Sequence, residues 1–229
     1  MNILYHVPLS PFCRKVRLSL AEKRIEVQLV EERYWEQDAD FLRRNPAGKV
    51  PVLKMDGKIF TESAAICEYL EEKYPEPSLM PTDPEIKFEV RRLVCWFDDK
   101  FHHEVTVNLL YEQVNRKIQN MPEKRGSGPI ASNVQAGLKA IKLHLYYLNW
   151  FLDNRRWLAG NAMSLADFAA AAQLSTIDYI GHLPPEVWNK YPALKNWYAT
   201  MKSRPAFRSI LSDNVPGFPQ PNHYSDFDF

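Results

Sequence analysis

Residues 10–17, Ser-Pro-Phe-Cys-Arg-Lys-Val-Arg, constrain the fold of this chain more than any other segment. They follow a short apolar run at 3–6 that predicts a strand, and they open a segment with helical periodicity. Ser10 therefore stands at a strand-to-helix junction, and Pro11 takes the first helical position, which is typical of a helix N-cap. The free N–H groups at such a helix start favour an anion, and a thiolate would suit that position.

Ser10 and Cys13 have the spacing of a Cys-x-x-Cys redox pair with serine in the first position. The chain therefore cannot close a disulfide there by itself, but Ser10 could orient a thiolate supplied by another molecule. The simpler alternative, common for a serine before proline, is that Ser10 only caps the helix.

Composition limits the remaining possibilities. The 229 residues are 45% hydrophobic and 25% charged, which suits one large or two small globular domains. The net charge of +1 gives no electrostatic reason to expect nucleic acid or an anionic membrane as partner. Three cysteines without metal-type spacing indicate reduced thiols and no metal site. Without a signal-peptide core or an apolar stretch of about 18 residues, we expect a soluble, cytoplasmic protein.

Two further N-terminal segments carry information about a site. The alternating run at 26–30 predicts a strand that completes a βαβ unit, and residues 45–53 predict a turn followed by a strand, with Pro51 at its start or edge. Glu62 and Ser63 then begin a helix, where backbone N–H groups and the serine hydroxyl can take a carboxylate and Glu62 an ammonium group. Trp35, in a polar stretch, is either a core anchor under a loop or an exposed recognition residue.

These segments, in this order, resemble the glutathione S-transferase superfamily. The resemblance implies an α/β N-terminal thioredoxin-like domain followed by an all-α C-terminal domain. It implies a homodimer as well, with glutathione as cosubstrate and no metal. It also implies a role for each matching residue: Ser10 faces the glutathione sulfur, Val50 offers its backbone to the cysteinyl part, Pro51 is cis, and Glu62 and Ser63 hold the γ-glutamyl group.

The rest of the chain has mostly helical periodicity. A long amphipathic helix is predicted from about residue 85 to the region of residue 116, and a polar loop with two glycines is predicted at 121–133. Four prolines among residues 75–84 interrupt the helical pattern, and Ser164 and Asp167 have capping-box spacing, which we interpret as structural rather than catalytic. The predicted units are a thioredoxin-like domain at 1–76, a linker at 77–84, a helical domain at 85–212 and an extended tail at 213–229.

The tail alternates acidic and aromatic residues and looks like a docking peptide. With Trp96-Phe97-Asp98, Gly128-Pro129 and Lys202-Ser203-Arg204-Pro205, it is similar to a branch of the superfamily that binds the bacterial tubulin homologue FtsZ in cell division. We therefore expect a dimeric adaptor for FtsZ filaments or, as the alternative, an enzyme that conjugates glutathione to an unidentified electrophile. The candidate partner-binding residues are Trp35, Tyr224, Asp226, Phe227, Asp228 and Phe229. If the tail docks on a partner, deleting 224–229 leaves stability unchanged; if it latches onto its own domain, deletion lowers it.

Overall fold

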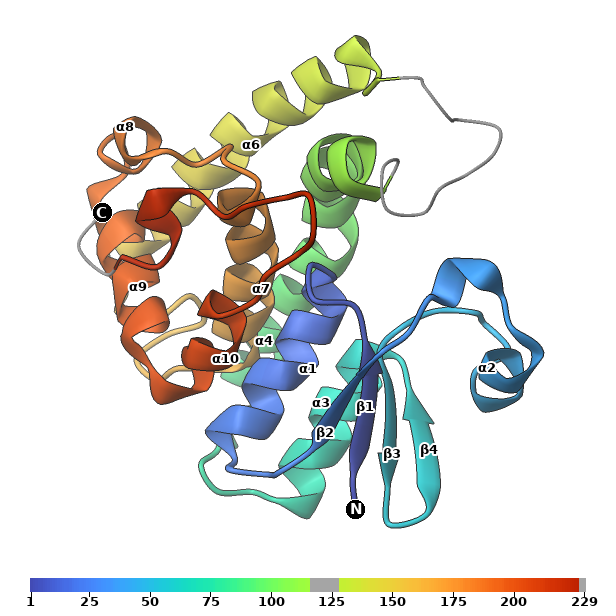
Figure 1. Ribbon diagram of the computed structural model, residues 1–229. Coiled ribbons are helices and arrows are strands. Elements are labelled where there is room, and N and C mark those ends of the chain that lie inside the picture. The colour runs from blue at the N-terminus through green and yellow to red at the C-terminus, as the bar shows by residue number, and fades with distance from the viewer. Residues whose placement is uncertain (116–127, 227–229) are drawn as a thin grey trace.

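A computed structural model describes residues 1–115 and 128–226. Its N-terminal part contains a four-stranded sheet in the order β2-β1-β3-β4 (Figure 1). The central strand β1 pairs in parallel with β2 and antiparallel with β3, as a βαβ unit followed by a hairpin requires. The strands are β1 (Ile3–His6), β2 (Gln28–Glu31), β3 (Val52–Met55) and β4 (Lys58–Thr61).

Two helices, α1 (Pro11–Glu22) and α3 (Ser63–Lys73), pack against each other beside the sheet. Helix α1 also packs against α7 (Leu165–Tyr179), so it lies between the sheet and the C-terminal helices (Figure 1). Almost every side chain of α1 after its first turn is buried for this reason. Between β2 and β3 the chain forms the short turn η1 (Tyr34–Glu36) and helix α2 (Ala39–Arg44).

Within the described residues, the named secondary-structure elements of the C-terminal part are all helices, joined by loops. The long helix predicted from residue 85 begins as α4 (Pro84–Cys95) and continues directly as η2, whose hydrogen bonds are of the π type. The elements are η2 (Trp96–Asn115), α6 (Ala131–Leu152), α7, α8 (Pro185–Trp188), α9 (Pro192–Ser203), η4 (Pro205–Phe207), α10 (Arg208–Leu211) and η5 (Asn222–Tyr224). Most of the loop predicted around 121–133 lies outside the described residues.

Helix α7 is the centre of the helical part, and all of its residues are buried. The predicted capping box is confirmed: Ser164 N donates to Asp167 Oδ2 at 2.9 Å, and the Ser164 side chain accepts from the backbone of residue 167. Asp167 also accepts from Trp197 Nε1 at 2.9 Å and Leu158 N at 3.1 Å. A run of alanines at 169–172 lets the surrounding helices approach closely.

The connection between the two parts is held by Lys23 at the end of α1. Its ammonium group donates to the carbonyls of Tyr74 and Pro77 at 2.6 and 3.0 Å and pairs with Glu71 at 2.8 Å. Three acceptors on one buried cation fix the path of the chain between α3 and α4. No helix within residues 1–115 and 128–226 is long and apolar enough to cross a membrane.

The C-terminal segment differs from the predicted extended tail. From Asp213 to Tyr224 it returns over α1 and α7 and ends in η5 (Figure 1). Tyr224 is 0% exposed. The expectation that Tyr224 is available to a partner is therefore wrong, because its ring packs edge-on against Tyr179 and its hydroxyl accepts from Arg14.

Candidate functional site

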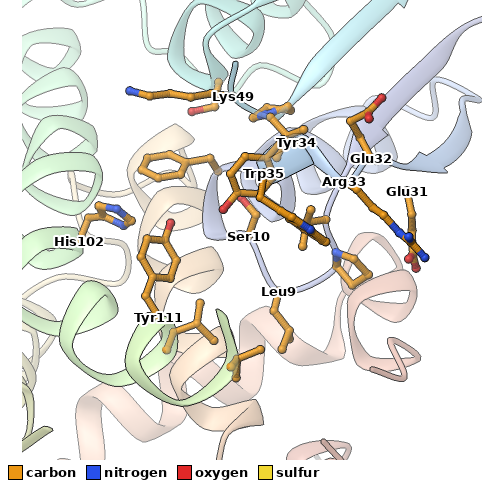
Figure 2. A pocket seen from close by; sticks show the side chains of 18 of the residues that line it. Leu9, Ser10, Glu31, Glu32, Arg33, Tyr34, Trp35, Lys49, His102 and Tyr111 are labelled. Carbon is orange, nitrogen blue, oxygen red and sulfur yellow. The ribbon is translucent and has the colours of Figure 1, made fainter. Parts of the chain in front are cut away.

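A cavity of about 1140 Å³ opens where the sheet meets the helices (Figure 2). Small-ligand pockets in proteins measure about 300–1,000 Å³, so the space holds a tripeptide-sized molecule with room to spare. Loops from the N-terminal part form one side, and η2 with the C-terminal segment forms the other. The cavity is lined by all five residues that the family resemblance assigns to one site: Ser10, Val50, Pro51, Glu62 and Ser63.

Ser10 caps α1, as predicted. Its hydroxyl oxygen accepts from Cys13 N at 3.3 Å, and Pro11 follows in the first turn. Because that bond uses the oxygen as acceptor, the hydroxyl proton stays available to a ligand. The helix start adds a partial positive charge, so the position favours a thiolate or another anion.

Cys13 is not a competing nucleophile. The side chain is buried, and burial raises the pKa of its thiol to about 11. The thiol is therefore protonated at neutral pH and closed to solvent. If thiolate chemistry occurs in the cavity, the sulfur must come from a ligand.

The turn before Pro51 is built by the buried Asn45. Its side chain accepts from Ala47 N at 3.1 Å and donates to the Lys49 carbonyl at 2.8 Å. The Val50–Pro51 peptide is cis, which confirms the prediction. Among the described residues, nothing hydrogen-bonds to the Val50 backbone N–H or C=O. An extended peptide could therefore pair with Val50 as a neighbouring strand would.

Glu62 stands at the start of α3 with φ of +66° and ψ of 111°. A residue other than glycine in this region costs of order 1–3 kcal/mol, and such strain occurs preferentially at ligand-binding sites. Glu62 is exposed to the cavity, whereas Ser63 beside it is buried at the first helical position. A carboxylate side chain next to a helix N-terminus offers one partner for an ammonium group and another for a carboxylate.

The opposite wall, from η2, was not found by sequence reasoning. His102 is 8% exposed and stacks at a tilt on Phe12, with ring centroids 4.7 Å apart. Its Nδ1 is buried and has no hydrogen-bond partner among the described residues. Burial and the neighbouring His103 lower the pKa of His102 to about 4, so the ring is neutral at pH 7. Burial raises the pKa of Tyr111, whose ring meets His102 edge-on. These rings reach Phe12 only in the folded protein, so no sequence motif predicts that they line the cavity.

Trp35 fits neither of its two predicted roles completely. It is half-buried in η1, and its indole borders the cavity across from Tyr111 (Figure 2). Tyr34 supports it edge-on at 5.4 Å between ring centroids. Trp35 can therefore contact a molecule in the cavity and one at its rim.

Of the remaining candidate residues of the tail, Asp226 is described, and it does not line the cavity. Asp226 is exposed, and Phe227, Asp228 and Phe229 lie outside the described residues. Three residues closer to the body, Asn214, Val215 and Pro216, line the cavity and were not expected there. Within the described ranges, no group of three or more His, Cys, Asp or Glu side chains could hold a metal ion.

Both parts of the chain match models of known protein families. Residues 4–78 match the family model "Glutathione S-transferase, N-terminal domain", and residues 130–205 match "Glutathione S-transferase, C-terminal domain". The chain belongs to the glutathione S-transferase family, and the predicted thioredoxin-like and all-helical fold is confirmed.

Within this family, the chain is 44% identical over 230 residues to FtsZ-localized protein A of Caulobacter vibrioides, covering 99% of this chain and 97% of the relative. The structure of FzlA from C. crescentus superposes with a TM-score of 0.92 at 43% identity, covering 100% of this chain and 99% of that one. A glutathione S-transferase from Rhodospirillum rubrum F11 gives the same TM-score at 46% identity, with both chains fully covered. The predicted similarity to an FtsZ-associated branch of the family is confirmed.

Proposed function

We propose that this chain is a dimeric adaptor that binds FtsZ filaments in the cytoplasm during bacterial cell division. The observation that carries the proposal is the 44% identity, over 99% of the chain, to a protein named for its localisation to FtsZ. Two copies of one binding surface on a rigid dimer would engage neighbouring subunits of a filament and gain avidity without new contacts.

Trp35 and the end of the tail are the proposed contact residues. Trp35 is half-exposed at the rim of the cavity, and Asp226 is exposed. Phe227, Asp228 and Phe229 follow Asp226 directly. Aromatic side chains bury a large area at small entropic cost, which suits them as anchors of an interface.

Co-sedimentation with GTP-assembled FtsZ tests this function. We expect wild-type protein to pellet with filaments, and Trp35→Ala and a chain ending after Asp226 to pellet at least about ten-fold more weakly, as loss of anchor residues does. Trp150→Ala is the matched control, because Trp150 is 55% exposed on α6 and is outside the proposed contact set. Absence of wild-type protein from the pellet contradicts the proposal, and a monomer in light scattering contradicts its dimeric form.

A second function, glutathione-dependent transfer, is favoured by a different observation. Ser10, Val50, Glu62 and Ser63 come from separate segments and line one cavity. In this proposal Ser10 donates a hydrogen bond to the glutathione thiolate, the Val50 backbone pairs with the cysteinyl residue, and Glu62 with Ser63 holds the γ-glutamyl end. The hydrogen bond would lower the thiol pKa and raise the thiolate fraction at neutral pH.

Calorimetric titration with glutathione tests the second function. We expect saturable binding by wild type and weaker binding by Glu62→Ala, which removes the carboxylate that would meet the ammonium group. Glu85→Ala, at the exposed start of α4, is the control for removing a carboxylate elsewhere. Heat changes no larger than buffer dilution would contradict a glutathione site in this cavity.

A further inference from the structure

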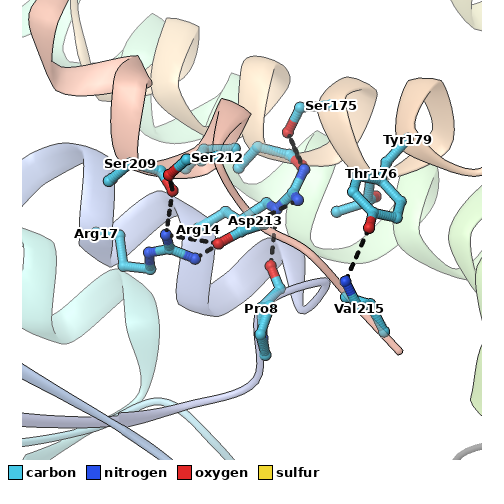
Figure 3. A network of polar contacts seen from close by, with 12 residues as sticks. Pro8, Arg14, Arg17, Ser175, Thr176, Tyr179, Ser209, Ser212, Asp213 and Val215 are labelled. Carbon is cyan, nitrogen blue, oxygen red and sulfur yellow. Dashed lines mark hydrogen bonds and ion pairs between the residues drawn. The ribbon is translucent and has the colours of Figure 1, made fainter. Parts of the chain in front are cut away.

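The guanidinium group of Arg14 connects the C-terminal segment to the loop that carries Ser10. Arg14 is 0% exposed, and its Nε donates to the Pro8 carbonyl at 2.8 Å. Its Nη1 donates to Ser175 Oγ at 2.9 Å, and its Nη2 donates to Asp213 Oδ2 at 3.0 Å (Figure 3). Nη1 also donates to the Tyr224 hydroxyl at 3.0 Å. One buried cation thus holds the 7–10 loop, α7 and both ends of the C-terminal segment.

Arg17, one turn along α1, strengthens the same anchor. It donates to both carboxylate oxygens of Asp213, at 2.9 and 3.0 Å, and to the Ser209 carbonyl at 2.7 Å. The Asp213 carboxylate therefore lies between two arginines of one helix (Figure 3). Charge-assisted bonds of this kind are strong and directional, so the position of Asp213 is closely determined.

The residues directly after Asp213 form part of the cavity wall. Asn214, Val215 and Pro216 line the cavity, and so do Pro8 and Ser10. Tyr179 fixes this stretch, because its hydroxyl accepts from Val215 N at 3.0 Å and donates to the Phe218 carbonyl at 2.9 Å. The Arg14 network therefore joins two walls of the cavity that are about 200 positions apart in sequence.

We infer that the C-terminal segment, residues 213–224, is a positioning and regulatory element of the cavity. When it is docked, it fixes Arg14, and Arg14 fixes the carbonyl of Pro8 and with it the loop that presents Ser10. Because coupling between two sites is reciprocal, a ligand that contacts both walls also stabilises the docked segment. This second step rests on the proposed glutathione site and takes glutathione as the ligand.

Hydrogen exchange of the ligand-free protein tests the positioning step. Tyr224→Phe keeps the buried ring and removes the hydroxyl that accepts from Arg14. We expect exchange to rise roughly ten-fold at the amides of Ser10, Cys13, Val215 and Phe218, as loss of a hydrogen bond to a charged group predicts, and to stay unchanged in α6.

Tyr191→Phe is the matched control, since it removes a tyrosine hydroxyl that donates to the exposed Lys142 carbonyl. Asp213→Asn, which weakens the other end of the network, should reproduce the pattern.

The result also separates positioning from simple stabilisation. A rise confined to 213–224, with Ser10 and Cys13 unchanged, overturns the inference, and so does an equal rise over the whole chain. In wild type, glutathione should slow exchange at Val215 and Phe218, and the protection should be smaller in Tyr224→Phe. Glutathione that binds by calorimetry without this protection overturns the regulatory step alone. If no glutathione binds, the proposed glutathione site and the regulatory step both fail, and the ligand-free comparison still decides whether the segment positions Ser10.

Discussion

Arg14 Nη1 lies 3.0 Å from the hydroxyl oxygen of Tyr224, and both side chains are fully buried. The bond joins the first helix of the chain to a residue 210 positions later. It explains why η5 belongs to the core: without Tyr224, the guanidinium loses an acceptor and Tyr179 loses an aromatic neighbour.

We predict that a chain ending after His223 is clearly less stable than wild type. Loss of a fully buried aromatic residue costs about 3–5 kcal/mol, which lowers Tm by about 10 °C for a protein of this size. Differential scanning calorimetry measures the change. A chain ending after Asp226 is the control, because it keeps Tyr224 and the contacts of η5. An unchanged Tm on removal of Tyr224 would restore the expectation of a free tail.

Ser10→Ala should affect the proposed thiolate chemistry more than stability. It removes one hydrogen bond to a charged sulfur, about 1.5–3 kcal/mol, so any glutathione-conjugating rate should fall roughly ten- to a hundred-fold. Loss of the cap costs about 1 kcal/mol of stability as well. Ser10→Thr keeps the hydroxyl and should retain most of the rate. If wild type conjugates none of a broad panel of electrophiles, the enzyme proposal is rejected.

Local patterns predicted the elements that depend on local chemistry. The Ser10 cap, the Ser164–Asp167 capping box and the Val50–Pro51 cis bond each follow from neighbouring residues and the family motif, and all three are present. The residues of the proposed glutathione site could be proposed from the sequence for the same reason, since each lies in a short motif at a strand or helix end.

Contacts between distant segments could not be predicted in this way. Nothing around Arg14 in the sequence shows that its partners are Ser175, Asp213 and Tyr224. The packing of α1 on α7 brings Ser175 to Arg14, and the return of the C-terminal segment over α1 brings Asp213 and Tyr224. His102 likewise belongs to a long helix whose cavity-facing side is defined by Phe12 from another element. The prediction that Tyr224 is available to a partner was wrong because the sequence does not show the surface of α1 and α7 on which Tyr224 packs.

Asp167→Ala should be among the most destabilising single substitutions in the helical part. The carboxylate is 0% exposed and accepts from the backbone of Leu158 and Ser164 and from the Trp197 indole. Alanine leaves these buried donors unpaired, at a cost of about 3–5 kcal/mol in the free energy of unfolding. Urea denaturation measures it, with the exposed Asp153→Ala as control. A loss below about 1 kcal/mol would mean that the capping box contributes little, as for an ordinary exposed cap.

The stability of the protein should decline on the acid side because two histidines are buried in neutral form. Burial lowers the pKa of His6 and of His102 to about 4, against an ordinary value of 6.5. Each depressed pKa contributes stability that is complete above pH 6.5 and is lost as pH falls toward 4, at up to about 1.4 kcal/mol per pH unit for each group. His223 has the opposite sign: its hydrogen bond to Asp178 raises its pKa, so its contribution is complete below pH 6.5 and declines at higher pH. In urea titrations between pH 7 and 4, His102→Gln should flatten the decline. His103→Gln, exposed on the same helix, removes only a smaller cause of the lowered pKa of His102 and leaves its burial, so it should flatten the decline less. Equal slopes for wild type and His102→Gln would show that His102 is not held neutral against the cavity wall.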